Sequence, residues 1–372
     1  MERKIAWMLL SESNRTSEKI KKLEKNFEKA FKDVNLYSDA AKAIENDIIR
    51  ARELGCEVIT YLDPIYPEAL RNISFPPPYL YVRGDVSLLN FPLKATIVGS
   101  REASLYGINT ASNFAFELAS NNVLVVSGGA KGIDTAAIKG AMKAGGRTIV
   151  VIGTGIDIDY PKENAALFAN VVKSGGLIVS EFPLGTGPFG RNFPIRNRIM
   201  TALGDSVVVV EAGERSGALI SATHALEQGK TLYAVPGNID SPNSQGTNAL
   251  LRDGALFATS GSDILFDLME KESEKYREAR DYEWNKAEEA EEKEEHKKTA
   301  ESKTDEGQNM AIGHLTPIEA AVVNAVKSGK DTYEEILEFC ACEPNKLTSV
   351  LTIMEIKGII KLAFGNRYKV SD

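Results

Sequence analysis

Short apolar runs alternate with longer mixed stretches between about residues 94 and 267. The runs are apolar throughout, as expected for strands that are buried on both faces of a sheet. The stretches between them are ten or more residues long, which is enough for crossover helices. This alternation predicts a parallel sheet with helices on both sides, a Rossmann-like α/β domain. The predicted strands are 95–98, 123–126, 148–152, 177–179, 206–210 and 231–235.

The chain before this region shows two other patterns. Residues 1–60 have the character of helices, and Ser38 is expected to cap one that stops at Gly55. Residues 64–78 are rich in proline, which predicts an extended connector leading to a short strand at 79–82. We therefore expect a helical N-terminal domain over 1–60 and an extended Rossmann-like domain over 61–269.

Two further segments follow the predicted sheet. Residues 270–311 have few apolar side chains and dense mixed charge, which predicts a charged linker, either solvated or a single exposed helix. Residues 312–372 begin with the capping-box pattern Thr316-Pro-Ile-Glu319 and contain three helical stretches followed by a hairpin pattern. These features predict a C-terminal winged helix.

The composition restricts the class of protein. Of the 372 residues, 43% are hydrophobic and 26% are charged, as in a globular protein of two or three domains. No apolar run approaches the ~20 residues of a membrane helix, and no cleavage site of a signal peptide follows the first apolar stretch. We expect a cytoplasmic protein without membrane insertion. The three cysteines, Cys56, Cys340 and Cys342, form no Cys-x-x-Cys pair, which favours a reduced compartment without structural metal.

The net charge of −8 is unusual for a protein that binds nucleic acid, but it is unevenly distributed. Residues 270–310 contain 9 Lys and Arg against 15 Asp and Glu, a net charge of −6. The rest of the chain is therefore close to neutral, and local basic patches are compatible with the composition.

Glycine-rich turns follow four of the predicted strands. In an open parallel sheet, ligands bind beyond the carboxyl ends of the strands, where these turns would lie. Glycine lets the backbone approach a ligand closely, and N–H groups at helix starts attract phosphate. One such turn would be explained by packing alone, whereas four at one edge favour a phosphate site. The candidate residues are Gly99, Ser100, Arg101, Ser127, Gly128, Gly129, Lys131, Lys162, Ser216 and Gly217.

The segment 189–198 interleaves three arginines with aromatic and amide side chains. Arginine binds phosphate and stacks on bases, and phenylalanine can stack as well, so Phe189 or Phe193 is a candidate stacking residue. The alternative is a solvated loop with one buried phenylalanine. The pattern Gly185-x-Gly-x-x-Gly190 does not directly follow its strand and contains Pro188, so we do not expect dinucleotide binding. The further DNA-binding candidates are Asn192, Arg196, Asn197 and Arg198.

Residues suited to catalysis are scarce. His296 and His314 lie in or beside the charged segment, and His224 is more typical of a surface or capping histidine than of a base. No Ser/His/Asp arrangement and no metal-ligand spacing occurs. Asp134 and Glu211 are the carboxylates to consider for acid–base chemistry, and each is equally suited to orienting loop amides or an arginine. We expect no enzymatic activity, no catalytic residues, no cofactor and no metal.

The motifs resemble, in the same order, the signature stretches of the DprA/Smf (DNA-processing protein A) family. They are Val98-Gly-Ser-Arg101, Ser127-Gly-Gly-Ala-Lys-Gly-Ile-Asp134, Gly153-Thr-Gly-Ile-Asp157, Tyr160-Pro-Lys162, Asn192-Phe-Pro-Ile-Arg-Asn-Arg198, Val210-Glu-Ala-Gly-Glu-Arg-Ser-Gly217 and Ala234-Val-Pro-Gly-Asn238. The resemblance extends over about residues 60–265 and, less specifically, over 312–372.

The resemblance implies a recombination mediator without catalytic activity. Such a protein binds single-stranded DNA in a basic pocket of its Rossmann domain, protects incoming strands and loads RecA during natural transformation. It also implies a homodimer formed through this domain. By the same resemblance, Arg101 and Lys162 are the principal DNA contacts.

Two alternative functions remain to be weighed. A nucleotide-processing enzyme of the phosphoribohydrolase type needs a glutamate at the start of a helix, but the stretch 217–226 contains no carboxylate. A nucleotide-sensing regulator would need a winged helix with a basic face for duplex DNA. Residues 316–372 contain 7 Lys and Arg against 8 Asp and Glu, which disfavours it.

Overall fold

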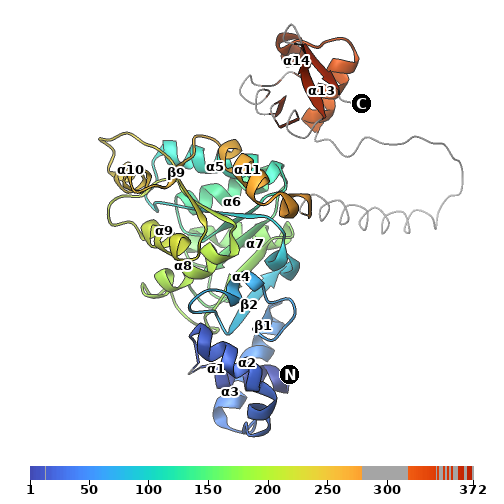
Figure 1. The fold of residues 1–372 in the computed structure, drawn as a ribbon. Helices are drawn as coiled ribbons and strands as arrows, with labels where there is room; N and C mark the ends of the chain where they lie inside the picture. Colours follow the sequence, from blue (N-terminus) through green and yellow to red (C-terminus); the bar gives the residue numbers. More distant parts are fainter. Residues whose placement is uncertain are drawn as a thin grey trace, which may run out of the picture. The chain divides into compact units, whose positions relative to one another are not determined.

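The computed structural model describes residues 1–12, 14–278, 317–340, 342, 347, 350–351, 353–354, 359–363 and 367–370. The chain divides into two compact units, Met1–Glu292 and Lys293–Asp372, and each is described by itself. Within the described part of the first unit, nine strands form one sheet in the order β1-β2-β6-β5-β4-β3-β7-β8-β9 (Figure 1). The strands are β1 (Glu57–Thr60), β2 (Tyr79–Gly84), β3 (Lys94–Val98), β4 (Leu124–Ser127), β5 (Thr148–Ile152), β6 (Leu177–Ser180), β7 (Ser206–Val209), β8 (Thr231–Ala234) and β9 (Leu256–Phe257).

The seven strands from β6 to β9 in this order are all parallel, and the predicted α/β fold is confirmed. All six predicted strands are present, with bounds that agree to within about a residue or two. Their central positions are fully buried, including Val125, Val150 and Val208. Burial on both faces is the reason that these strands are apolar throughout.

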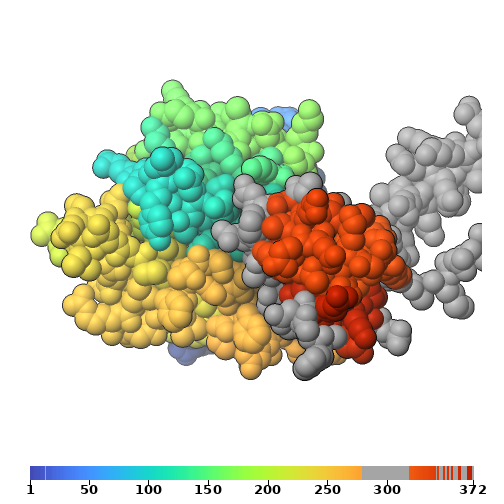
Figure 2. Space-filling view, turned by 90° about the horizontal axis from the view of Figure 1, so that it is seen from above, coloured from blue at the N-terminus to red at the C-terminus, as the bar shows by residue number. Residues whose placement is uncertain are grey.

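Helices cover both faces of the sheet. From β3 the chain moves outward through β4, β5 and β6, and it then returns to the other side of β3 for β7, β8 and β9. Because crossover connections are right-handed, this reversal of direction places α8 and α9 on the face opposite to α5, α6 and α7. The helices and short 3₁₀ turns are η1 (Val86–Asn90), α5 (Leu105–Ser120), α6 (Ile133–Lys143), η2 (Lys162–Asn164), α7 (Ala165–Lys173), α8 (Asn192–Leu203), α9 (Gly217–Glu227), η3 (Pro242–Ser244), α10 (Gln245–Arg252) and α11 (Gly261–Lys271). Figure 2 shows the α5 region in cyan beside the orange residues of α11, which packs on α5.

The N-terminal segment begins with three helices, α1 (Glu2–Ser11), α2 (Ser17–Lys32) and α3 (Asp39–Glu53). Ser38 caps α3 as predicted, since its hydroxyl accepts a hydrogen bond from the Ala41 N–H at 3.2 Å. Gly55 then takes a left-handed conformation with φ of 69°, which ends the helix.

Residues 57–60 differ from the prediction, because they form strand β1 and not a helix. β1 pairs antiparallel with β2, which in turn pairs antiparallel with β6, so this segment extends the edge of the main sheet. The short helix α4 (Glu68–Arg71) interrupts the connector that was expected to be extended. The pairing of β1 brings Val58 and Ile59 into buried positions, which is a tertiary effect that local sequence does not reveal.

The N-terminal helices and the sheet share a hydrophobic core. Ile5 and Ile48 belong to the same buried cluster as Val150 and Ile178. Trp7 is fully buried, and its indole N–H donates to the Pro78 carbonyl at 2.8 Å. The domain boundary expected at residue 60 is therefore crossed by buried contacts, and it stays a prediction.

The second unit contains α13 (Pro317–Lys327), α14 (Tyr333–Cys340) and the antiparallel pair β10 (Ile360–Ala363) and β11 (Arg367–Val370). Leu347, Leu351 and Met354 are helical and belong to its buried core, in the region of the predicted third helix. Thr316, with its expected capping box, lies outside the described residues. The winged helix as a whole stays a prediction.

The segment expected to be a charged linker is described only at its beginning. Residues 273–278 are helical, and the Lys275 ammonium forms an ion pair with Asp205 at 2.8 Å. Residues 279–311 lie outside the described residues, as do His296 and His314. The charged linker therefore remains a prediction. Across the part of the chain that is described, no helix has the length and apolar character to cross a membrane.

Candidate nucleic-acid interface

A cavity of about 710 Å³ lies at the carboxyl edge of the sheet, next to the point where the strand order reverses between β3 and β7. In open parallel sheets this switch point is the usual ligand position, since the loops on its two sides diverge. The lining residues come from the segments that follow β3, β4, β5, β6, β7 and β8 and from α8 and α9. They are Val98, Gly99, Ser100, Arg101, Glu102, Ala130, Asp134, Tyr160, Pro188, Gly190, Phe193, Pro194, Arg196, Asn197, Met200, Gly213, Arg215, Ser216, Gly217, Ala218, Ile220, Ser221 and Asn243.

The cavity brings together half of the residues proposed from the sequence. The turn after β3, the helix α8 and the start of α9 each contribute to its walls. These residues are Gly99, Ser100, Arg101, Arg196, Asn197, Ser216 and Gly217. The other half do not line it, and they are Ser127, Gly128, Gly129, Lys131, Lys162, Asn192 and Arg198.

The glycines in the turns after β3 and β4 mainly allow these turns to pack closely on one another. A Cβ at Gly99 would lie 2.6 Å from the Ile133 side chain, and one at Gly132, where φ is 74°, would lie 2.3 Å from the Ser100 carbonyl oxygen. The N–H of Ile133 donates to that same carbonyl at 3.1 Å. The turns after β3 and β4 are therefore packed directly on one another.

The start of α9 is the clearest anion position in the cavity. Ser216 caps the helix, and its hydroxyl accepts a hydrogen bond from the Ala218 N–H at 3.2 Å. Ser216, Gly217 and Ala218 all line the cavity, so the positive end of the helix dipole faces it. Arg215 lines it too, and it was not among the residues predicted from the sequence; its position beside the capping serine was the available signal.

Three side chains contact one another in the lining of the cavity. The Arg101 guanidinium lies over the Phe193 ring at 4.8 Å from its centroid, and the Tyr160 ring lies 5.6 Å from that of Phe193. Arg101 and Tyr160 are exposed to solvent. Phe193 thus holds a stacking position that the sequence suggested, whereas Tyr160 was not recognised as part of it. A second pair, Arg191 over Phe189 at 5.8 Å, lies nearby in sequence.

Arg196 forms the buried floor of the cavity and is only 4% exposed. Its guanidinium donates to the carbonyls of Val151 and Gly128, the latter at 2.6 Å. Burial lowers the pKa of Arg196 to about 10, opposed by the nearby Asp134 carboxylate. Burial likewise raises the pKa of Asp134, opposed mainly by Arg196. Arg196 holds the turn after β4 through the Gly128 carbonyl, and Asp134 holds it through the Ala130 N–H.

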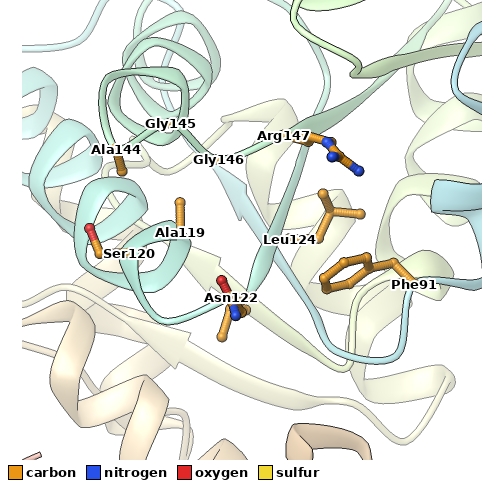
Figure 3. Close-up of a pocket in the computed structure, with 10 residues that line it drawn as sticks. Phe91, Ala119, Ser120, Asn122, Leu124, Ala144, Gly145, Gly146 and Arg147 are labelled. Atoms are coloured by element: carbon orange, nitrogen blue, oxygen red, sulfur yellow. The ribbon is translucent and has the colours of Figure 1, made fainter. Parts of the chain in front are cut away.

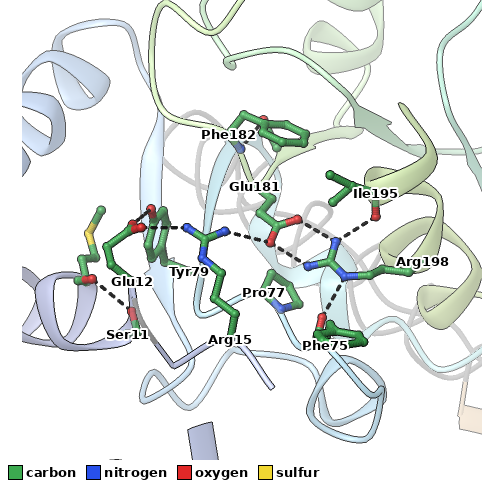
Figure 4. Close-up of polar contacts among 12 residues, drawn as sticks. Ser11, Glu12, Arg15, Phe75, Pro77, Tyr79, Glu181, Phe182, Ile195 and Arg198 are labelled. Atoms are coloured by element: carbon green, nitrogen blue, oxygen red, sulfur yellow. Dashed lines mark hydrogen bonds and ion pairs between the residues drawn. The ribbon is translucent and has the colours of Figure 1, made fainter. Parts of the chain in front are cut away.

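Most of the proposed residues outside the cavity are engaged within the protein. Arg198 forms two hydrogen bonds of 2.6 Å with Glu181 (Figure 4). Asn192 donates to the Gly153 carbonyl at 3.2 Å, and the Ser127 hydroxyl donates to the Ile97 carbonyl at 2.8 Å. Lys131 is paired with Glu163 at 2.7 Å in an exposed position. Lys162 is exposed at the surface beside that pair.

The two carboxylates considered for acid–base chemistry have structural partners. Glu211 is 2% exposed and accepts hydrogen bonds from the N–H and the hydroxyl of Ser104, the N-cap of α5. Asp134 accepts from the Ala130 N–H at 3.2 Å, and its charge interacts favourably with that of Arg196. His224, at 3.2 Å from Glu227, lies outside the lining of the cavity. Each carboxylate orients a turn or a helix start.

A second, smaller cavity of about 170 Å³ lies at the amino edge of the sheet (Figure 3). Its walls come from the residues just before β4 and β5, with Phe91, Leu124 and Arg147 among them. Arg147 lies 3.9 Å from Asp85. This cavity contains none of the residues proposed from the sequence, and we place the candidate interface at the larger one.

Comparison with known proteins identifies relatives of this chain. The family model described as DNA recombination-mediator protein A matches residues 57–269. Protein Smf of Escherichia coli K12 is 38% identical over 227 residues, which are 61% of this chain and 60% of that protein. The DNA processing protein DprA of Streptococcus pneumoniae R6 is 43% identical over 204 residues, covering 55% of this chain and 71% of the relative.

Two solved structures share the fold. The X-ray structure of DprA from Streptococcus pneumoniae superposes with a TM-score of 0.57 at 32% identity, covering 71% of this chain and 92% of that one. A structure described as showing the single-stranded DNA binding mode of DNA processing protein A from Helicobacter pylori gives a TM-score of 0.53 at 32% identity, with 58% and 96% covered. The family model covers more than half of this chain and all of the strands that form the cavity. The chain therefore belongs to the DNA recombination-mediator protein A family, and the proteins named DprA and Smf are its relatives.

Proposed function

We propose that this protein is a recombination mediator that binds single-stranded DNA across the cavity at the carboxyl edge of its sheet. The observation that carries the proposal is the contact of Arg101 and Tyr160 with the Phe193 ring, in a cavity that the start of α9 also lines. An exposed arginine and a helix N-terminus suit phosphates, and aromatic rings suit unpaired bases. Duplex DNA offers no unstacked base to such a surface. The Helicobacter pylori relative, described as binding single-stranded DNA, supports the proposal.

Within this function, Arg101 and Lys162 are proposed as the principal phosphate contacts. Both are exposed, and they lie on the turn after β3 and at η2. Phosphate contacts carry no sequence information, so little sequence preference is expected. Affinity should fall as the salt concentration rises, because binding of the basic side chains releases counterions from the strand and added salt opposes that release.

The test compares binding of labelled oligo-dT and of duplex of equal length at two salt concentrations. The wild-type protein should prefer the single strand. Arg101→Ala/Lys162→Ala should weaken binding and lower the slope of log K against log salt by about 1.4, since each phosphate contact on a single strand contributes about 0.7. Lys21→Ala/Lys22→Ala on the exposed face of α2 removes the same charge and is the control.

Normal binding by the Arg101/Lys162 variant would exclude this assignment of the site. Equal or stronger binding of duplex would favour the nucleotide-sensing regulator. Absence of binding to either DNA would direct attention to nucleotide hydrolysis, assayed as release of free base.

The protection of incoming strands, the loading of RecA and a homodimer are further parts of the proposal. The edge strand β9 exposes Leu256 and Phe257, and Phe266 of α11 is also exposed, which suits contact with a second copy. The dimer is tested by analytical ultracentrifugation of the wild-type protein. RecA loading is tested by the rate of RecA filament formation on single strands coated with single-strand-binding protein. A monomer, or an unchanged rate, would contradict these parts.

A further inference from the structure

A network of charged side chains joins α8 to the N-terminal half of the chain (Figure 4). At its centre is Glu181, which directly follows β6 and is 5% exposed. Its two carboxylate oxygens accept hydrogen bonds of 2.6 Å from Arg198 of α8. Arg198 also donates from Nε to the Phe75 carbonyl of the proline-rich connector at 2.8 Å. Arg15, in the turn between α1 and α2, reaches Glu181 at 3.8 Å.

Each end of this network is held by further contacts. Arg15 donates to Glu12 at 3.0 Å, and Glu12 accepts from the hydroxyl of Tyr79 in β2 at 2.7 Å. At the other end, the Arg198 carbonyl accepts from the Gln228 side chain at 2.9 Å, just beyond α9. The network therefore spans the turn after α1, β2, the end of β6 and α8.

The helix α8 has two functional sides. Phe193, Asn197 and Met200 lie on one side and line the DNA cavity. Successive residues of a helix are rotated by about 100°, so Arg198 projects roughly 140° away from Phe193. The guanidinium that sequence reasoning assigned to DNA is thus on the side of α8 turned away from most of the cavity. It is fixed there by a carboxylate and a backbone carbonyl.

We infer that Glu181 is a positioning residue of the DNA site, which acts through Arg198 to set the orientation of α8. The bidentate geometry restrains both the rotation and the translation of the helix, as a single contact would not. The side chains on the cavity side of α8, Phe193 above all, move with it. This inference rests on the proposed function, since it concerns how the cavity binds the strand.

The energetics favour a fixed pair over a mobile one. Glu181 and Arg198 have only 4% and 11% of their side chains exposed, so their attraction is poorly screened by water. Removing one partner leaves the other charge buried without compensation, and the structure must shift to hydrate it. Arg15, with 45% of its side chain exposed, contributes a weaker link to the same carboxylate.

The test uses three variants of the full chain and the oligo-dT assay at several salt concentrations. Glu181→Gln keeps the size and removes the charge, and it should weaken binding about tenfold, because small displacements of a site are costly. Arg198→Lys keeps the charge and loses the bidentate geometry, and it should weaken binding about threefold. Arg15→Ala leaves the pair of Glu181 and Arg198 in place and should change affinity by about twofold or less.

The salt dependence separates positioning from contact. Glu181→Gln and Arg198→Lys should leave the slope of log K against log salt unchanged, because neither residue touches phosphate, whereas Arg101→Ala should lower it by about 0.7. The double variant Glu181→Gln/Arg198→Lys should bind no more weakly than Glu181→Gln alone, since both changes break one interaction. Thermal unfolding establishes that each variant is folded at the temperature of the assay. If Glu181→Gln is unfolded there, Arg198→Lys provides the test instead.

The outcomes are distinct. A lower salt slope for Arg198→Lys would make Arg198 a phosphate contact and overturn the inference. Folded variants that bind like the wild type would show a role in stability alone, with the same consequence. A loss in Arg15→Ala as large as that in Glu181→Gln would place the effect in the N-terminal link and not in α8. If the wild type itself does not bind oligo-dT, the proposed function fails independently of this network.

Discussion

Replacing Asp134 by Asn tests whether the floor of the cavity depends on the buried negative charge of Asp134 near Arg196. Asp134 lies in the first turn of α6 and is 6% exposed, and the nearby Arg196 is 4% exposed. Asn keeps the shape and an acceptor oxygen but removes the negative charge. The Arg196 guanidinium remains in place because the carbonyls of Gly128 and Val151 hold it.

The expected cost follows from the burial of the remaining charge. Leaving a buried charge without the opposite charge near it costs up to about 3–5 kcal/mol of unfolding free energy. That is a large part of the ~5–15 kcal/mol that stabilises a typical domain. A surface pair would cost far less, so the magnitude itself reports on whether the site is dry.

The assay is urea unfolding of the purified protein followed by circular dichroism. Asp134→Asn, Arg196→Met and the double variant form a double-mutant cycle. The loss of unfolding free energy in the double variant should be smaller than the sum of the two single losses by about 2 kcal/mol or more. Glu163→Gln, which alters the exposed pair with Lys131, is the control and should leave the midpoint unchanged. A loss below about 1 kcal/mol for Asp134→Asn, or additive losses in the cycle, would refute the reasoning.

Three further predictions concern other parts of the first unit. Burial lowers the pKa of Lys94 to about 8. From pH 8 to about 10.5 the unfolded chain therefore keeps a proton on Lys94 that the folded chain has released, so the unfolding free energy of the wild type should rise by up to about 3 kcal/mol over this interval. Urea unfolding at pH 8 and at about pH 10.5 measures this gain, and Lys94→Met should abolish it. Gly107→Ala should destabilise the protein by about 1–3 kcal/mol in the same assay, because its Cβ would lie 2.3 Å from the buried Glu211 carboxylate; a stabilised variant would show that the ~1 kcal/mol helix preference of alanine prevails. Arg101→Lys should weaken oligo-dT binding about threefold while the salt slope stays unchanged, since the charge remains and the stacking on Phe193 is lost; an unchanged affinity would exclude a role for that stacking.

The strands of the sheet were predictable because their burial leaves a mark in the sequence. A strand covered on both faces must be apolar at nearly every position, and β3 to β8 satisfy this condition within four or five residues each. β1 and β9 are short edge strands, and only pairing with a neighbour makes them strands at all. The prediction was therefore reliable in the centre of the sheet and weak at its edges.

The location of the site was predictable for a topological reason. Parallel strands place their following turns at one edge, so the glycine turns after β3, β4 and β7 had to meet there. What the turns do was only partly foreseen. Gly99 and Gly132 allow two turns to pack together, while the start of α9 faces the cavity with its N–H groups.

From the sequence alone follow the α/β class, the edge of the sheet that carries the proposed site, the motifs of the family and the presence of arginines and aromatic rings near α8. The sequence does not show what each arginine does. Arg101, Arg196 and Arg198 have the same chemistry, yet the first is exposed over a ring, the second is buried on backbone carbonyls and the third is paired with Glu181. Those partners come from distant segments of the chain and depend on burial. Only the tertiary structure therefore decides which charge remains available for a ligand.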